Sequence, residues 1–178
     1  DRFYHVAKQY NPEHIVRLTG DCPLADPQLI DQVIAYYLNG DFDYVSNTIK
    51  PTYPDGLDVE IFNFPSLESA WREAILPSQR EHVTPFLYQH PERFKIGSFK
   101  NDIDLSDLRW TVDESADFAL VSKIYEGLYP INPYFVTTDI LDFLDKNSEL
   151  KRVNAHHSRN EGYLKSLNKD ELFLKEKR

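Results

Sequence analysis

Residues 14–24, HIVRLTGDCPL, join an apolar, β-branched run to a turn that contains Asp21. Residues 108–113, LRWTVD, repeat this arrangement and end at Asp113. Each run predicts a short buried strand that stops at a carboxylate and leads into a helix. In an open α/β sheet, ligands bind beyond the carboxyl ends of the strands, where helix N-termini also point. Two aspartates there predict a seat for Mg²⁺, which takes few protein oxygens and completes its shell with substrate phosphates.

Helix and strand signals alternate along the chain and predict an α/β fold with a mixed, largely parallel sheet. The expected strands cover residues 14–18, 42–47, 57–62, 94–99 and 108–113. The expected helices cover residues 1–10, 26–39, 66–75, 79–90, 115–128 and 139–146. Their expected N-terminal caps include Asp26, Ser66 and Thr138. We predict an α/β domain over residues 1–151, followed over residues 152–178 by a polar C-terminal arm, extended apart from a short helix near 169–176.

Composition narrows the class of protein. The 178 residues suit a single core, and no apolar run approaches the ~20 residues that span a membrane. Cys22 is the only cysteine, so an internal disulfide is excluded and a reducing, cytoplasmic location is expected. The net charge of −9 argues against broad binding to nucleic acid or to acidic membranes.

Five short motifs occur in a fixed order and carry a family resemblance. They are LTGDCPL at 18–24, YPDGLDVE at 53–60, REHVTP at 80–85, RWTVD at 109–113, and NAH at 154–156 followed by RNEGY at 159–163. Together they resemble the cytidylyltransferases of the acylneuraminate and KDO type, with the spore coat polysaccharide biosynthesis protein F group as the nearest branch. The resemblance covers nearly the whole chain.

The resemblance implies a three-layer α/β/α nucleotidyltransferase fold, Rossmann-like and of the nucleotide-diphosphosugar transferase type. It also implies attack of a sugar hydroxyl on the α-phosphorus of CTP, giving a CMP-sugar and pyrophosphate. The sugar would be an acid of the acylneuraminate or KDO type, used in cell-surface or spore coat polysaccharide synthesis. By similarity, Asp21 and Asp113 match the family aspartates that hold Mg²⁺. Family members often pair through an inserted arm, which makes a homodimer an expectation.

One departure from the family pattern concerns the start of the chain. Family members begin with a strand and a glycine-rich, basic loop that cradles the CTP phosphates, and this stretch is absent here. The sequence contains no methionine and opens inside an amphipathic helix. We therefore expect an N-terminally truncated enzyme that is inactive, or nearly so, by itself.

Candidate substrate residues lie in the middle motifs. Asp55, Gly56, Asp58 and Glu60 belong to a Pro-Asp-Gly turn and the strand after it, where backbone groups and carboxylates are suited to sugar hydroxyls. A plain turn leading into a strand is an equally good explanation for any single acid.

Three further candidates for substrate binding have nitrogen-containing side chains. The guanidinium of Arg80 suits a carboxylate or phosphate and is also the expected partner of Asp58 and Glu60. His82 is a candidate donor, acid or base, with a purely structural histidine as the alternative. Arg109, within a motif, is a third candidate cation for an anionic substrate.

Alternatives remain at the level of residues and of function. Asp21 and Asp113 are also suited to capping turns or helices. A nucleotide-sugar-dependent glycosyltransferase shares the general fold, but is expected to carry two acids close together where Asp21 is followed by Cys22 and Pro23. A non-catalytic sugar-binding or scaffold remnant is the third reading.

Overall fold

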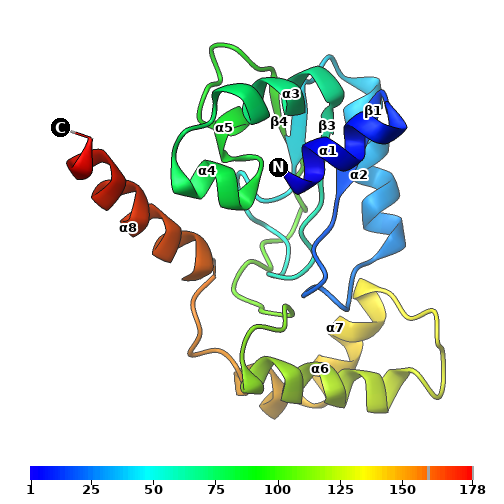
Figure 1. Cartoon of the computed structure of the whole chain (residues 1–178). Coiled ribbons are helices and arrows are strands. Elements are labelled where there is room, and N and C mark those ends of the chain that lie inside the picture. Colours follow the sequence, from blue (N-terminus) through cyan, green and yellow to red (C-terminus); the bar gives the residue numbers. More distant parts are fainter. Residues whose placement is uncertain (160, 178) are drawn as a thin grey trace.

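The computed structural model describes residues 1–159 and 161–177, and a four-stranded mixed sheet lies at its centre (Figure 1). The strands are β1 (His14–Arg17), β2 (Tyr44–Ser46), β3 (Glu60–Asn63) and β4 (Ile96–Ser98), in the order β1-β3-β2-β4. β3 runs antiparallel to both of its neighbours, whereas β2 and β4 are parallel. β1, β2 and β4 therefore share one direction, which confirms the mixed sheet.

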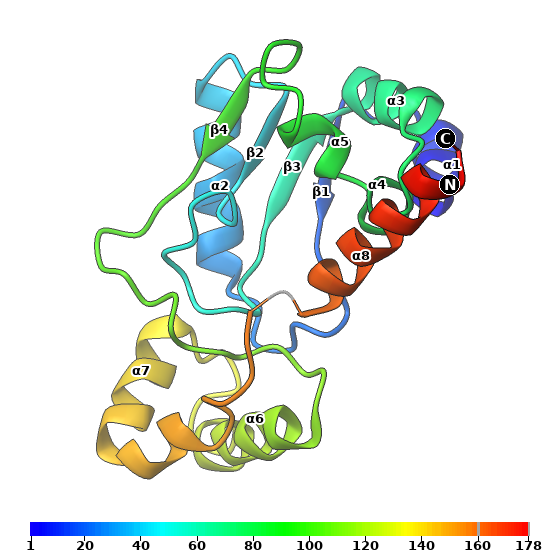
Figure 2. The ribbon, with the colours of Figure 1, turned by 90° about the vertical axis from the view of Figure 1, so that its left-hand side faces the viewer.

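Helices cover both faces of this sheet, which gives the predicted three layers (Figure 2). One face carries α2 (Pro27–Asn39), and the other carries α1 (Arg2–Tyr10), α3 (Phe64–Glu73) and α5 (Pro85–Tyr88). A further pair, α6 (Ser115–Leu128) and α7 (Thr137–Lys146), packs at one end of the sheet and extends the α2 core.

Period-two alternation along the strands separates two cores. Val45 and Ile61 face α2, while their neighbours Tyr44 and Phe62 face α3 and α5. All four side chains are at most 2% exposed. Successive side chains of a strand point to opposite faces, so a strand buried on both faces is apolar along its whole length.

The Asp26 cap is confirmed and does more than predicted. Its carboxylate accepts hydrogen bonds from the amides of Gln28 and Leu29, the ordinary N-cap arrangement. The second oxygen accepts from the amide and the hydroxyl of Thr137, at 3.0 and 2.6 Å. One side chain therefore fixes the starts of both α2 and α7.

Two predicted caps were misplaced. α3 begins at Phe64, and Asn63 rather than Ser66 caps it, accepting from the Ser66 amide at 2.8 Å. α7 begins at Thr137, so the predicted cap Thr138 lies inside the helix.

The predicted helix over 79–90 is two short helices, α4 (Pro77–His82) and α5. Between them Val83 has φ of 73°, which no helix accommodates. Pro85 has no amide hydrogen to donate, which suits it to the first position of a new helix.

The predicted strand over 108–113 does not join the sheet. It is an extended segment that meets the 53–57 turn through a single bridge between Asp55 and Arg109. Its backbone hydrogen bonds go to loops instead of to a neighbouring strand, so the strand prediction was wrong.

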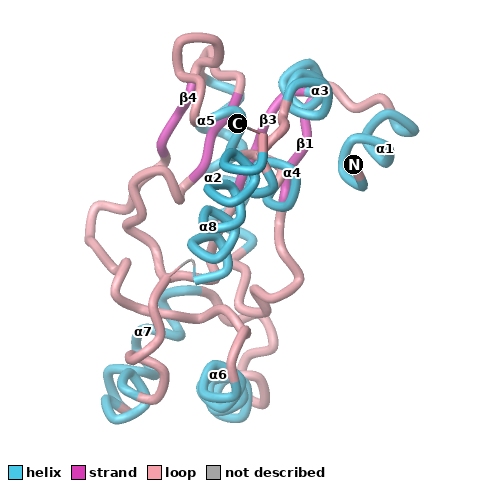
Figure 3. Tube along the Cα trace, turned by 60° about the vertical axis from the view of Figure 1, so that its left-hand side comes forward, coloured by secondary structure: helices cyan, strands magenta, loops and turns pink. Residues whose placement is uncertain are grey.

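The C-terminal segment is more structured than predicted. A short 3₁₀ helix, η1 (Ser148–Arg152), precedes α8 (Glu161–Glu176), which is longer than the expected helix and lies beside α4 (Figure 3). The Asp170 carboxylate accepts from the Ser78 amide at 2.8 Å and from its hydroxyl at 2.5 Å. Among the described residues, no helix is both long and apolar enough to cross a membrane.

Candidate active site

Asp21 and Asp113 lie side by side although 92 positions separate them in the sequence. The Val112 amide donates to the Asp21 carbonyl at 2.8 Å, and the Thr111 hydroxyl donates to the same oxygen at 3.2 Å. Both aspartates are exposed. The two predicted metal ligands therefore occupy neighbouring, solvent-facing positions.

Arg109 organises the carboxylates behind this pair. Its Nη2 donates to Asp113 at 2.9 Å and to Asp117 at 2.8 Å, and its Nη1 donates to Asp55 at 3.1 Å. The Arg109 side chain is only 8% exposed. Its cationic state is strongly favoured, because the hydrogen bonds and charge of Asp117 raise the pKa of Arg109 further above its usual range. Arg109 is thus committed to protein carboxylates.

Asp117 is the residue of this cluster that sequence reasoning missed. Burial opposes its ionisation, but hydrogen bonds from Arg109, Asn154 and two backbone amides hold the pKa of Asp117 well below its usual range. Those amides belong to Asp113 and Glu114, at the start of α6. The alternative that Asp113 caps α6 is wrong, because Glu114 is the N-cap residue of this helix.

Gly56 lets the substrate turn approach the 108–113 segment closely. Its φ is +102°, and a Cβ placed there would lie 2.4 Å from the Thr111 nitrogen. At the preceding residue, the Asp55 amide donates to the Leu108 carbonyl and the Trp110 amide donates to the Asp55 carbonyl. Glycine is the residue that tolerates this conformation and this contact.

Arg159 closes the turn from the C-terminal side. Its Nη2 donates to Asp58 at 2.7 Å and its Nη1 to the Tyr53 carbonyl at 2.9 Å. Burial raises the pKa of Asp58 to about 6, and although Arg159 lowers it, nearby acids including Asp21 raise it further. Asp58 is therefore electrostatically coupled to the metal-ligand candidate Asp21.

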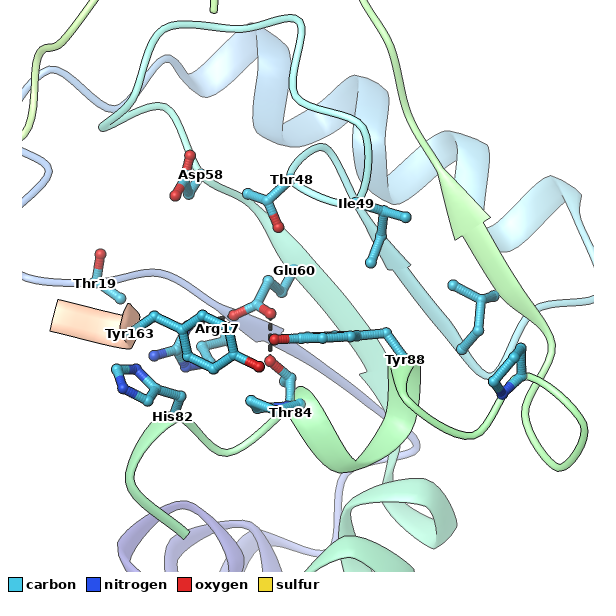
Figure 4. A pocket seen from close by; sticks show the side chains of 13 residues that line it. Arg17, Thr19, Thr48, Ile49, Asp58, Glu60, His82, Thr84, Tyr88 and Tyr163 are labelled. Atoms are coloured by element: carbon cyan, nitrogen blue, oxygen red, sulfur yellow. Dashed lines mark hydrogen bonds and ion pairs between the residues drawn. The ribbon is translucent and has the colours of Figure 1, made fainter. Parts of the chain in front are cut away.

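A pocket of about 460 Å³ opens beside Asp58 (Figure 4). Glu60 lies at its base: it is 6% exposed, pairs with Arg17 on the opposite strand, and accepts from the hydroxyls of Tyr44 and Thr84 at 2.6 and 2.5 Å. Its carboxylate is fully engaged by the protein. Glu60 therefore shapes and charges the pocket more than it offers free acceptors.

Aromatic and imidazole rings complete the pocket wall. The hydroxyls of Tyr88 from α5 and Tyr163 from α8 point toward each other in Figure 4. His82 stacks edge-on against Tyr163 and lies 3.0 Å from the Ser166 hydroxyl. Burial lowers the pKa of His82, which favours the neutral ring. The aromatic pair comes from segments 75 positions apart, so no local pattern could have predicted it.

Arg80 lies outside this pocket. It donates to the Trp71 carbonyl at 2.7 Å and pairs with Asp1, which places it behind α3. The expected pairing of Arg80 with Asp58 and Glu60 is wrong, because Arg159 and Arg17 take those two acids.

The fit of a metal to these residues rests on Asp21 and Asp113. No group of three or more His, Cys, Asp or Glu side chains able to hold a metal is found among the described residues. Arg109 engages Oδ2 of Asp113, and the exposure of both acids leaves them accessible from solvent. Two hard, solvent-facing oxygen donors fit Mg²⁺, which relies on substrate phosphates and water for its remaining ligands.

A mixed sheet lies between two layers of helices, and two neighbouring aspartates lie beside a polar pocket. This arrangement defines an α/β protein of the nucleotidyltransferase-like class. The family model named "Cytidylyltransferase" matches residues 1–168. This chain belongs to the cytidylyltransferase family.

Two curated proteins and a solved structure are similar to this chain. The chain is 40% identical over 160 residues to the uncharacterized protein MJ1063 of Methanocaldococcus jannaschii, covering 88% of this chain and 63% of that protein. It is 29% identical over 154 residues to the spore coat polysaccharide biosynthesis protein SpsF of Bacillus subtilis, covering 84% and 62%. A solved cytidylyltransferase from Leptospira borgpetersenii superposes with a TM-score of 0.79 at 30% identity, covering 88% and 65%. The chain thus spans less than two thirds of the length of these relatives.

Proposed function

We propose that this chain supplies the metal-binding and acceptor-binding parts of an enzyme that transfers CMP from CTP to a sugar hydroxyl. The observation that carries the proposal is the contact between the Asp21 carbonyl and the Val112 amide, which brings Asp21 and Asp113 together. The pocket lining includes Thr19, two residues before Asp21, and also Asp58. A metal–nucleotide complex on the two aspartates would therefore lie next to an acceptor in the pocket.

The reaction requires stabilisation of the negative charge that builds on phosphate oxygens. The acceptor oxygen forms a bond to the α-phosphorus of CTP while the bond to pyrophosphate breaks, and negative charge builds on the leaving group. Mg²⁺ bound by Asp21 and Asp113 would offset that charge and position the phosphates. Arg109 would hold Asp113 in place and would not bind phosphate, because the N–H donors of Arg109 bond to protein carboxylates and to the Ser158 carbonyl.

We further propose that a segment outside these 178 residues grips the triphosphate. More than a third of each relative lies outside the part that this chain matches, and the cations around the aspartates, Arg109 and Arg159, are already paired. The chain by itself would then form little CMP-sugar. A role in polysaccharide synthesis is supported by the name of the SpsF relative, and a reducing, cytoplasmic setting fits the lone thiol of Cys22.

The test is CTP-dependent pyrophosphate release by a version of the protein extended to the length of its relatives, with Mg²⁺ and a sugar mixture. Asp113→Asn should lower the rate at least a hundredfold, whereas Asp139→Asn, at the start of α7, should leave it unchanged. Sugar-dependent release that is indifferent to Asp113→Asn would refute the proposed site.

A further inference from the structure

Residues 154–159 belong to the fifth sequence motif and run between η1 and α8 (Figure 2). Asn154 is 2% exposed, and its side-chain nitrogen donates to the Arg109 carbonyl at 2.9 Å and to the Asp117 carboxylate at 2.8 Å. The Ser158 carbonyl accepts from the Arg109 guanidinium at 3.2 Å. The segment is therefore fixed against the buried Arg109–Asp117 pair.

Arg159, at the other end of this segment, contacts the substrate turn and the pocket acid Asp58. Its Nη2 donates to Asp58 at 2.7 Å and its Nη1 donates to the Tyr53 carbonyl at 2.9 Å. Burial raises the pKa of Asp58 and the charge of Arg159 lowers it, so Arg159 favours the carboxylate form. Asp58 lines the pocket, whereas the described lining residues do not include Arg159 (Figure 4). Arg159 therefore acts on the pocket through Asp58.

A chain of alternating charges joins Asp58 to the metal-ligand candidate Asp113. Asp55 lies between two arginines: its Oδ1 is 3.8 Å from Nε of Arg159, and its Oδ2 accepts from Nη1 of Arg109 at 3.1 Å. Burial raises the pKa of Asp55, and both guanidinium groups lower it. The members of the chain, in order, are Asp58, Arg159, Asp55, Arg109 and Asp113. Because each member holds the next, the position of the pocket acid is tied to that of Asp113.

We propose that Arg159 is a positioning residue of the transfer reaction, which holds Asp58 against the acceptor at a fixed place relative to Asp113. This inference rests on the proposed function, which makes the pocket the acceptor site. Attack on the α-phosphorus requires the acceptor oxygen to lie about 3–3.5 Å away in line, and a small displacement lowers the rate strongly. Without Arg159 the Asp58 carboxylate would turn away from the acceptor, which would then bind more weakly.

The experiment measures pyrophosphate release by the version extended to the length of its relatives, at saturating CTP and Mg²⁺, while the acceptor concentration is varied. N-acetylneuraminate and KDO are the first acceptors, and the active component of the sugar mixture replaces them if neither reacts. We expect Arg159→Ala to raise the acceptor KM at least fivefold and to leave the CTP KM within twofold of the wild type.

Two variants provide the comparison. Arg159→Lys keeps the positive charge but has a single nitrogen in place of the guanidinium fork, so its acceptor KM should lie between those of the wild type and Arg159→Ala. Arg93→Ala removes an arginine from an exposed ion pair with Glu73 and should leave both KM values unchanged.

A double-mutant cycle separates positioning from a structural role. If Arg159 acts through Asp58, Arg159→Ala should change the acceptor KM less than twofold in an Asp58→Ala background. Equal effects in the two backgrounds would overturn the inference, as would an unchanged acceptor KM in Arg159→Ala. Urea unfolding checks that each variant is folded, and Arg159→Lys takes the place of Arg159→Ala in the cycle if the alanine variant is unfolded.

The proposed function and this inference fail in different ways. Pyrophosphate release that requires Asp113 but has the same acceptor KM with and without Arg159 would overturn the inference and leave the transferase standing. No release by the extended wild-type protein would overturn both.

Discussion

Arg109 grips Asp117 with two parallel hydrogen bonds, from Nε at 2.9 Å and from Nη2 at 2.8 Å. Arg109 is 8% exposed and Asp117 is fully buried. A planar guanidinium that meets a carboxylate in this way is strongly oriented. Because the same Nη2 also holds Asp113, the buried pair fixes the direction of an exposed carboxylate that we assign to the metal.

Asp117→Asn should destabilise the fold by about 3 kcal/mol, because it leaves a buried guanidinium without its best partner. Urea unfolding measures this loss. Asp113→Asn is the matched control: its half-exposed ion pair with the same arginine should contribute under about 1 kcal/mol. Equal losses of unfolding free energy in the two variants would show that the buried Arg109–Asp117 pair contributes no more stability than the Arg109–Asp113 pair.

Gly56→Ala should lower the free energy of unfolding by about 2–3 kcal/mol, since the new Cβ meets the Thr111 backbone and the residue has a positive φ. Gly20→Ala provides the comparison, because nothing lies within 4 Å of its Cβ position. Thermal and urea unfolding of both variants check this. A Gly56→Ala protein as stable as Gly20→Ala would mean that the turn relaxes away from the 108–113 segment.

The raised pKa of Asp58 predicts a pH dependence of stability. Its folded pKa of about 6 lies above the ordinary value of 3.8, so between those values the folded state binds more protons than the unfolded state. Stability therefore falls as pH rises from about 4 to 6, by roughly 1–3 kcal/mol for this group.

Asp58→Asn isolates that contribution. Urea unfolding at pH 4 and at pH 7 should show the wild-type protein losing stability relative to the variant as pH rises. A difference between the two proteins that stays constant with pH would argue against the raised pKa.

Asp170→Ala should loosen α8 from α4. The Ser78 amide and hydroxyl would both lose their acceptor in a buried setting, which costs about 1–3 kcal/mol. Hydrogen exchange of residues 161–176 should accelerate, while Glu171→Ala, one residue later and exposed, should exchange as the wild type does. Unchanged exchange in Asp170→Ala would show that other contacts hold α8.

Local sequence signals predicted much of this fold. The Asp26-Pro27 pair marked the start of α2 because capping depends on residues within one turn. The apolar run at β2 was found because both sheet faces bury it. The run at β1 does form a strand, but the prediction that it is buried was wrong, because β1 lies at the edge of the sheet and its Val16 is 38% exposed. The run over 108–113 misled because burial does not require a strand: Trp110 is fully buried in the core that includes α2, α6 and α7, although its segment does not join the sheet.

The candidate site was predictable only in part. Asp21 and Asp113 could be singled out because each ends an apolar run, and their proximity follows from the fold. The partners of the charges could not be predicted, since Arg17, Arg80 and Arg159 are all close in sequence to plausible acids. Tertiary packing alone decides that Arg159 takes Asp58 and that Arg80 takes the Trp71 carbonyl.

The central claim is that Asp21 and Asp113 together seat a metal-bound nucleotide. Calorimetric titration of CTP, with and without Mg²⁺, on the 178-residue chain and on a version extended to the length of its relatives tests it most directly. We predict Mg²⁺-dependent CTP binding in the extended protein that Asp21→Asn weakens at least tenfold, with little binding to the shorter chain. CTP binding that ignores both Mg²⁺ and Asp21→Asn, or no CTP binding by either protein, would contradict the account.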